Sequence, residues 1–235
     1  MMHPVLILAG GFGTRLKSVV PDLPKPLADI NGKPFLWWLL QELENQGAKD
    51  VYLSVGYMHE HIQNYFGPKF NQVNLHYIIE TEPLGTGGAI LNACQQIPGQ
   101  EILILNGDTL AKTDLNAFVT FAKDFSSKLF LAVAKVADAG RYGTVILSGK
   151  QITGFAEKGK TGEGLINAGI YLLNKSLFND FDLPHKFSFE TEILMKHLST
   201  LNLTAYEQVF DFIDIGIPDD YALAQEKVPA MVLNK

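Results

Sequence analysis

The sequence predicts an α/β fold with a mixed central sheet in a single Rossmann-like domain, on three observations. Apolar runs of strand length alternate with amphipathic stretches through the first half, which is typical of strand–helix–strand units on a largely parallel sheet. The second half holds mostly strands and few helices, which favours a mixed sheet. The 235 residues, 47% of them hydrophobic, are enough to form one sizeable core.

The first half is expected to contribute four buried strands and four helices. The first helix places Phe35, Leu39, Leu40 and Leu43 on one face, and Gly47 follows as a C-terminal cap. The expected strands cover residues 5–9, 51–55, 75–79 and 102–105, and the expected helices cover residues 34–46, 59–65, 87–96 and 115–123.

The second half is expected to begin with four strands, at residues 129–136, 143–147, 152–155 and 168–173. No linker rich in Ser, Pro or Gly separates the two halves. Residues 1–235 are therefore expected to form one continuous domain, with a first half of about 1–125 and a second half of about 126–235.

Composition excludes several classes of protein. The net charge of -6 argues against a nucleic-acid binder, which needs an excess of cations facing phosphates. The single cysteine, Cys94, excludes a disulfide framework and a cysteine-rich zinc site. No apolar stretch approaches the ~18 residues of a membrane span, and the N-terminus lacks the pattern of a signal peptide. The expected location is the cytoplasm.

A glycine-rich segment, LAGGFGTRL at residues 8–16, follows the first expected strand directly. Glycines let backbone N–H groups approach a polyphosphate, while a hydroxyl and a guanidinium add further donors. The candidate anion-binding residues are Gly10, Gly11, Gly13, Thr14 and Arg15. The competing interpretation is a tight strand-to-helix turn that binds nothing.

Two common phosphate motifs do not fit this segment. A P-loop needs Lys and then Ser or Thr after its last glycine, where Thr14 and Arg15 stand here. A dinucleotide fingerprint needs a small residue at the position that Leu16 occupies. It also needs an acidic residue at the end of the second strand, where Gly56 follows here. Further on, Lys25 lies between two prolines, which hold the backbone extended and would direct its ammonium group toward the loop. Alone, such a tripeptide is more often an exposed, solvated turn.

Two carboxylates are candidate metal ligands. Asp108 emerges after the apolar strand at residues 102–105, and Asp214 lies in the apolar run FIDIG. Burying an ionised carboxylate among apolar residues is costly without a metal or a partner. Two carboxylates suit Mg²⁺ if phosphates and waters complete its shell. For Asp108 alone, capping of a turn is the alternative.

LAGGFGTRL followed by LPKPLADINGKPFL resembles the signature of the sugar nucleotidyltransferases, which share a glycosyltransferase-A-type fold. The resemblance implies that the glycine loop surrounds a nucleoside triphosphate, that Arg15, Lys25 and Asp108 are catalytic, and that Asp108 and Asp214 bind Mg²⁺. It assigns nucleotide binding to the first half and sugar-phosphate binding to the second. The implied nucleotide-binding residues are Leu8, Ala9, Gly10, Gly11, Gly13, Thr14, Arg15, Lys25, Glu80, Gly85 and Thr86.

Two further segments resemble family sites. In the segment at residues 80–89, Gly85 and Thr86 would contact the base, and a carboxylate of Glu80 or Glu82 would accept hydrogen bonds from guanine; the alternative is a plain helix N-terminus entered through Thr86. The implied sugar-phosphate residues are Asn106, Gly107, Tyr142, Gly143, Glu157, Lys158 and Asn167. Without the resemblance, the last five would be ordinary surface groups and turns.

The resemblance implies an in-line attack of a sugar 1-phosphate on the α-phosphorus of a nucleoside triphosphate. Residues 13–36 together with EPLGTGGA at residues 82–89 most resemble guanylyltransferases acting on D-glycero-α-D-manno-heptose 1-phosphate. The resemblance therefore favours GTP as the nucleotide. The alternatives are mannose-1-phosphate guanylyltransferase, N-acetylmuramate-1-phosphate uridylyltransferase, and a non-catalytic regulatory subunit that binds nucleotide sugars. No β-helix domain, nucleic-acid partner or membrane partner is expected, and a homo-oligomer is possible.

Overall fold

The computed structural model describes residues 2–11, 16, 23–157, 159 and 161–233. The chain folds into two compact units. The first comprises Met1–Pro83, Leu105–Leu110 and Ile213–Lys235, and the second comprises Leu84–Ile104 and Ala111–Phe212. Strands β7 (Glu101–Asn106), β8 (Thr109–Lys112) and β14 (Asp211–Asp214) each contain residues of both units.

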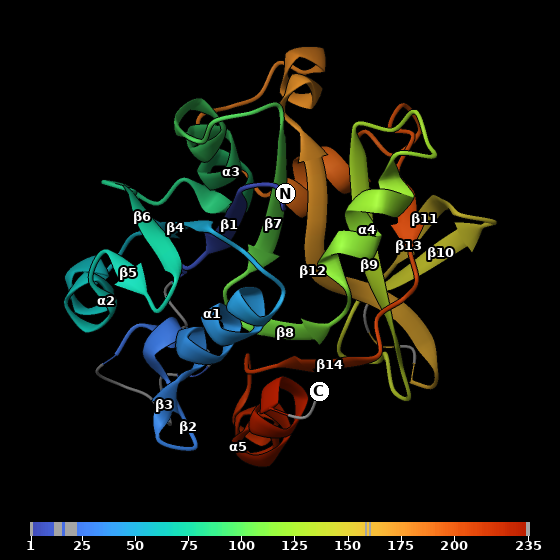
Figure 1. Cartoon of the computed structure of the whole chain (residues 1–235). Helices are drawn as coiled ribbons and strands as arrows, with labels where there is room; N and C mark the ends of the chain where they lie inside the picture. Colours follow the sequence, from blue (N-terminus) through green and yellow to red (C-terminus); the bar gives the residue numbers. More distant parts are fainter. Residues whose placement is uncertain (1, 12–15, 17–22, 158, 160, 234–235) are drawn as a thin grey trace. The chain divides into compact units, whose positions relative to one another are not determined.

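The first unit is built on parallel strands. β1 (Val5–Leu8), β4 (Asp50–Val55) and β6 (Val73–Ile79) lie side by side in that order, and the short β5 (Lys69–Phe70) pairs antiparallel with β6 (Figure 1). Their apolar side chains form a core in which Leu6, Ile7 and Leu53 are fully buried. Because parallel strands end at the same edge, the residues that follow β1, β4 and β6 are brought close together.

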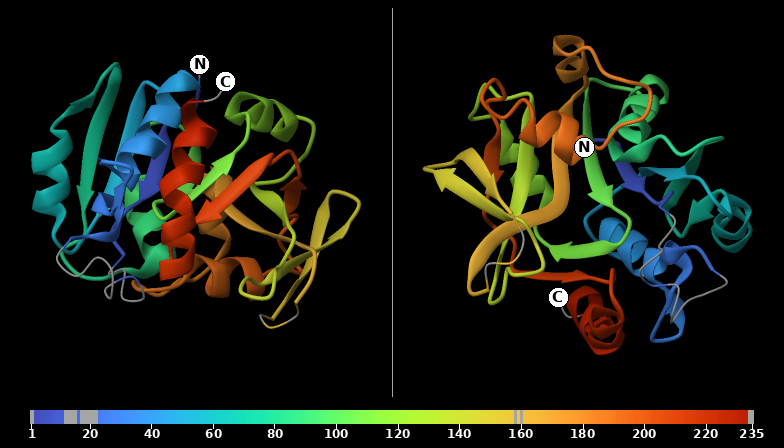
Figure 2. Two further views of the ribbon diagram at one scale, coloured as in Figure 1. Left: turned by 90° about the horizontal axis from the view of Figure 1, so that it is seen from below. Right: turned by 180° about the vertical axis from the view of Figure 1, so that it is seen from behind.

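The described part of this unit also contains the α-helices α1 (Phe35–Asn45), α2 (His59–Phe66) and α5 (Pro218–Leu233). α5 packs beside α1, as the left view of Figure 2 shows. It also holds the hairpin of β2 (Asp29–Ile30) and β3 (Lys33–Pro34), because the hydroxyl of Tyr221 and the amide of Gln225 both donate to the carbonyl of Asp29, at 2.6 and 3.0 Å. The segment after β14 is thereby tied to the segment that precedes α1.

The second unit contains antiparallel and parallel pairings. β9 (Leu129–Val136) pairs antiparallel with the long β12 (Gly164–Asn174) and parallel with β13 (Thr204–Tyr206). The hairpin of β10 (Thr144–Ser148) and β11 (Gln151–Ala156) joins β13 through β11. The helical segments are α3 (Gly85–Gln96), α4 (Leu115–Ala122), the 3₁₀ turn η3 (Lys175–Asp180) and a π-helical turn, η4 (Glu190–Met195).

The predicted α/β class with a mixed sheet is confirmed. The expected strands and helices agree with the structure to within a few residues at each end, and Gly47 has the positive φ of +87° that suits a helix C-terminus. The prediction placed the start of α3 two residues too late, and it missed α5 and the short strands β2, β3, β5, β8 and β13. Among the described residues, no helix combines the length and apolarity needed to span a membrane.

Candidate active site

Lys25 lies close to Asp108 and Asp214, and these three residues form a charged cluster in the first unit. Pro24 is extended, with φ of -65° and ψ of 143°, and Pro26 and Leu27 are buried, so this short segment, η2 (Lys25–Leu27), is anchored on both sides of the lysine. Lys25 Nζ donates to Asp108 Oδ2 at 2.7 Å and lies 3.9 Å from Asp214 Oδ1. Three residues predicted from separate motifs are therefore brought together.

Main-chain hydrogen bonds fix the two carboxylates of the cluster. The N–H of Gly107 donates to the carbonyl of Leu8 at 3.0 Å, which ties the end of β7 to the end of β1. The N–H of Ile215 donates to the carbonyl of Asp108 at 3.0 Å, so the residue after Asp214 is bonded to Asp108 itself. Backbone hydrogen bonds thus help to position both aspartates.

Asp214 sits in an environment that opposes its negative charge. Its side chain is 24% exposed. Burial raises the pKa of Asp214, and the nearby charges of Asp108 and Asp220 also raise it, whereas Lys25 and the N–H of Gly216, which donates to Oδ1 at 2.5 Å, lower it. A net rise despite a neighbouring lysine indicates that the site can accommodate further positive charge.

Gly107 is required at its position by a close approach of two backbones. A Cβ atom there would lie 2.4 Å from the carbonyl oxygen of Leu8, and backbone atoms cannot move aside as a flexible side chain can. We expect Gly107→Ala to lower the free energy of unfolding by about 2 kcal/mol in urea titrations. Gly11→Ala is the matched control, because a Cβ at Gly11 meets nothing within 4 Å. Equal stability of the two variants would contradict this account.

The described part of the glycine-rich segment contacts the predicted base-binding carboxylate. Ser54, buried in β4, donates through its hydroxyl to Glu80 Oε1 at 2.8 Å. A Cβ on Gly10 would lie 2.8 Å from the same oxygen, so glycine allows the loop to pass directly over Glu80. Ala9 is held by its N–H, which donates to the carbonyl of Ser54 at 2.8 Å. Gly13, Thr14, Arg15 and Lys158 lie outside the described residues.

In the second unit, Gly85 and Thr86 form the first turn of α3 instead of a loop before it. Gly85 has a φ of +72°, and a Cβ there would lie 2.5 Å from the carbonyl oxygen of Phe187. The Thr86 hydroxyl donates to Glu190 Oε2 and accepts from the N–H of Phe189, both at 2.9 Å. The sequence does not predict the contacts of Ser54 with Glu80 or of Glu190 with Thr86, because in each pair the two residues belong to different segments without a shared motif.

Three predicted sugar-phosphate residues of the second unit adjoin paired strand positions. Thr144, which follows Gly143, pairs with Ala156, which precedes Glu157, and with Ile166, which precedes Asn167. Tyr142 packs edge-on against Phe212, with ring centroids 5.7 Å apart. Asn167 uses its amide within β12, donating to the hydroxyl of Tyr171 at 2.7 Å and accepting from the N–H of Gly169 at 2.8 Å. Gly143 immediately precedes β10, and the exposed Glu157 immediately follows β11.

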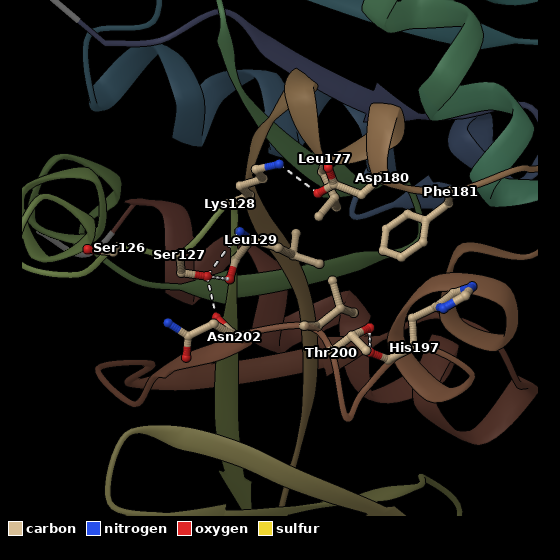
Figure 3. A pocket seen from close by; sticks show the side chains of 11 residues that line it. Ser126, Ser127, Lys128, Leu129, Leu177, Asp180, Phe181, His197, Thr200 and Asn202 are labelled. Carbon is tan, nitrogen blue, oxygen red and sulfur yellow. Dashed lines mark hydrogen bonds and ion pairs between the residues drawn. The ribbon is translucent and has the colours of Figure 1, made fainter.

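A surface pocket in the second unit contains none of the predicted site residues (Figure 3). Two of its charged residues pair with each other, because Lys128 Nζ lies 2.6 Å from Asp180 Oδ2. The ring of His197 lies against the ring of Phe181. No group of three or more His, Cys, Asp or Glu side chains suited to a metal occurs in the part of the chain that the structure describes. The paired carboxylates Asp108 and Asp214 therefore remain the candidate cation site.

Comparison with known proteins agrees with this chemistry. A family model described as nucleotidyl transferase matches residues 4–230. The chain is 44% identical over 223 residues to D-glycero-α-D-manno-heptose 1-phosphate guanylyltransferase of Aneurinibacillus thermoaerophilus, covering 95% of this chain and 97% of the relative. It is 47% identical over 219 residues to the protein of that name from Campylobacter jejuni, covering 92% of this chain and 96% of the relative.

A solved structure supports the same relationship. The crystal structure of HddC from Yersinia pseudotuberculosis complexed with GMP-PN is 41% identical, has a TM-score of 0.84, and is matched over 96% of this chain and 99% of that one. The family match spans nearly the whole sequence, and these relatives are covered over nearly their full lengths. The chain therefore belongs to the nucleotidyl transferase family.

Proposed function

We propose that this chain transfers the guanylyl group of GTP to D-glycero-α-D-manno-heptose 1-phosphate, forming GDP-heptose and pyrophosphate. The observation that carries the proposal is the convergence of Lys25, Asp108 and Asp214 on one another, at 2.7 and 3.9 Å from the lysine nitrogen. Such a cluster suits phosphate transfer, where positioning and charge stabilisation do most of the work. The choice of GTP and heptose rests on the relatives that carry those names.

In this reaction a phosphate oxygen of the sugar phosphate forms a bond to the α-phosphorus of GTP. The bond from that phosphorus to the bridging oxygen breaks, and pyrophosphate leaves with the electron pair. Gly10 and Gly11 would present backbone N–H groups to the triphosphate, while Lys25 and Arg15 would offset its charge. The nucleophile is already anionic near neutral pH, so no residue need act as a general base.

We propose that Asp108 and Asp214 hold Mg²⁺. Their carboxylate oxygens are the donor type that Mg²⁺ prefers, and the pKa of Asp214, raised by burial and by Asp108, marks a place where added positive charge is favourable. When bound, the metal would neutralise phosphate charge and polarise the α-phosphoryl group.

In the second unit we assign base contacts to Gly85 and Thr86, and in the first unit to Glu80. A carboxylate accepts hydrogen bonds from guanine N1–H and its amino group together, a pair of donors that uracil lacks. The proposed contacts of the sugar phosphate are Asn106 and Gly107 in the first unit, and Tyr142, Gly143, Glu157, Lys158 and Asn167 in the second.

A pyrophosphate-release assay tests this function directly. GTP, UTP, CTP and ATP are each paired with heptose 1-phosphate, mannose 1-phosphate and N-acetylmuramate 1-phosphate in the presence of Mg²⁺. We expect GTP with heptose 1-phosphate to give a kcat/KM at least about tenfold above every other pair, because a site with hydrogen-bonding groups rejects substrates that leave those groups unpaired. Preference for mannose 1-phosphate or UTP would replace the substrate assignment. Nucleotide binding without turnover of any pair would favour a non-catalytic subunit.

A further inference from the structure

The hydroxyl of Thr86 is fixed by a segment about a hundred residues further along the chain. It accepts a hydrogen bond from the N–H of Phe189 and donates one to Glu190 Oε2, both at 2.9 Å. The same carboxylate oxygen accepts from the hydroxyl of Ser188 at 3.1 Å. Because the hydroxyl donates its single hydrogen to Glu190 and accepts at the same time, the side chain of Thr86 is confined to one rotamer.

The main chain of this segment also completes the N-terminus of α3. α3 has no side-chain cap. The carbonyl of Phe187 instead accepts from the N–H of Gly87 at 3.0 Å, and the N–H of Phe187 donates to the carbonyl of Leu84 at 3.0 Å. A Cβ on Gly87 would lie 2.1 Å from the Phe187 ring, so only glycine permits this approach. The run of glycines after Leu84 therefore serves the docking of the segment at residues 185–190.

The docked segment is itself anchored in the core of the second unit. Phe189 is 1% exposed and packs edge-on against Tyr171, with ring centroids 5.4 Å apart. The Tyr171 hydroxyl accepts from the side-chain amide of Asn167 at 2.7 Å. A continuous set of contacts thus connects Asn167, a proposed sugar contact, with Thr86, a proposed base contact.

We propose that Glu190 is a positioning residue for nucleotide recognition, holding the Thr86 hydroxyl and the first turn of α3 in the orientation that receives the base. This inference rests on the proposed function, in which Gly85 and Thr86 contact the base. A carboxylate acceptor restrains a hydroxyl more strongly than a neutral one does. Glu192, two residues further on and half-buried, instead pairs with the exposed Lys196 at 2.8 Å.

Steady-state kinetics of four variants test the proposal. We expect Glu190→Ala to raise KM for GTP about tenfold, with kcat and KM for the sugar phosphate each within about threefold of wild type, since only the orientation of a nucleotide-binding turn is loosened. Glu190→Gln, which keeps an acceptor oxygen, should recover most of the loss. Glu190→Asp, which keeps the charge but shortens the reach, should not. Glu192→Ala is the matched control and should behave as wild type.

A mutant cycle with Thr86→Val separates positioning from general destabilisation. If Glu190 acts through the Thr86 hydroxyl, adding Glu190→Ala to Thr86→Val changes KM for GTP by less than about twofold further. Glu190→Asp replaces Glu190→Ala in the cycle if the alanine variant does not fold. Kinetics of Glu190→Ala equal to those of Glu192→Ala, or equal losses for both substrates, would overturn the proposal. Failure of the proposed function is distinct from either result, because wild type itself would then not turn over GTP.

Discussion

Asparagine in place of Asp108 is expected to lower kcat/KM for GTP by about a thousandfold, equivalent to roughly 4 kcal/mol of transition-state stabilisation. Asparagine keeps the shape of the side chain but removes the charge that faces Lys25 at 2.7 Å. The neutral amide is a poor ligand for Mg²⁺, and the paired-carboxylate site is reduced to Asp214. Pyrophosphate release measured across a Mg²⁺ titration checks the result.

The same experiment needs a control for the loss of an aspartate near this cluster. Asp211 lies on β14, three residues before Asp214, and its carboxylate accepts from the N–H of Phe212 at 2.8 Å. Asp211→Asn should therefore keep kcat/KM within about twofold of wild type. Asp108→Asn should also unfold at nearly the wild-type temperature, because the amide oxygen can still accept from Lys25 and the charged Asp214 remains beside the lysine. Full activity of Asp108→Asn at saturating Mg²⁺ would disprove the metal assignment.

The regular elements of the first half follow from local sequence, because their apolar patterns match the period of a strand or a helix. α1 shows this well, with Phe35, Leu39 and Leu43 buried on one face and Gly47 at its end. α5 was missed because Pro229 lies inside it and interrupts the periodic pattern. Pro218 followed by two aspartates was a usable signal for a helix start that the prediction did not exploit.

The sequence predicts residues of the candidate site, but it does not predict their geometry. Lys25 lies 3.9 Å from Asp214, and nearby α5 is bonded to the β2–β3 hairpin through contacts between residues almost two hundred positions apart. The early start of α3 has a similar cause, because Gly85 adopts its positive φ where the segment around Phe187 packs against it. Local propensity contains no information on either contact. Tertiary contacts therefore determine how the predicted residues are positioned relative to one another.

Replacing Lys25 with methionine is expected to separate its structural role from its catalytic one. The lysine side chain is 9% exposed and lies between two carboxylates, and methionine preserves its apolar contacts while removing the charge. Without Mg²⁺, Asp108 and Asp214 then face each other with no cation, so the free energy of unfolding should fall by about 2 kcal/mol, less than for a fully buried pair because Asp108 is partly exposed. Turnover should fall about a hundredfold through loss of charge on the triphosphate.

Mg²⁺ should restore the stability that Lys25→Met loses, but it should not restore the turnover. Because the ammonium group and a bound cation act on the same two carboxylates, Mg²⁺ should raise the melting temperature of Lys25→Met by more than that of wild type, while activity stays low. Lys33→Met serves as the control, since Lys33 is exposed on β3 with its Nζ over the Trp37 ring. Thermal unfolding of all three proteins across a Mg²⁺ series makes the comparison. An equal Mg²⁺ shift in wild type and Lys25→Met would mean that the lysine and the metal do not share these carboxylates, and the charge-balancing role given to Lys25 would have to be abandoned.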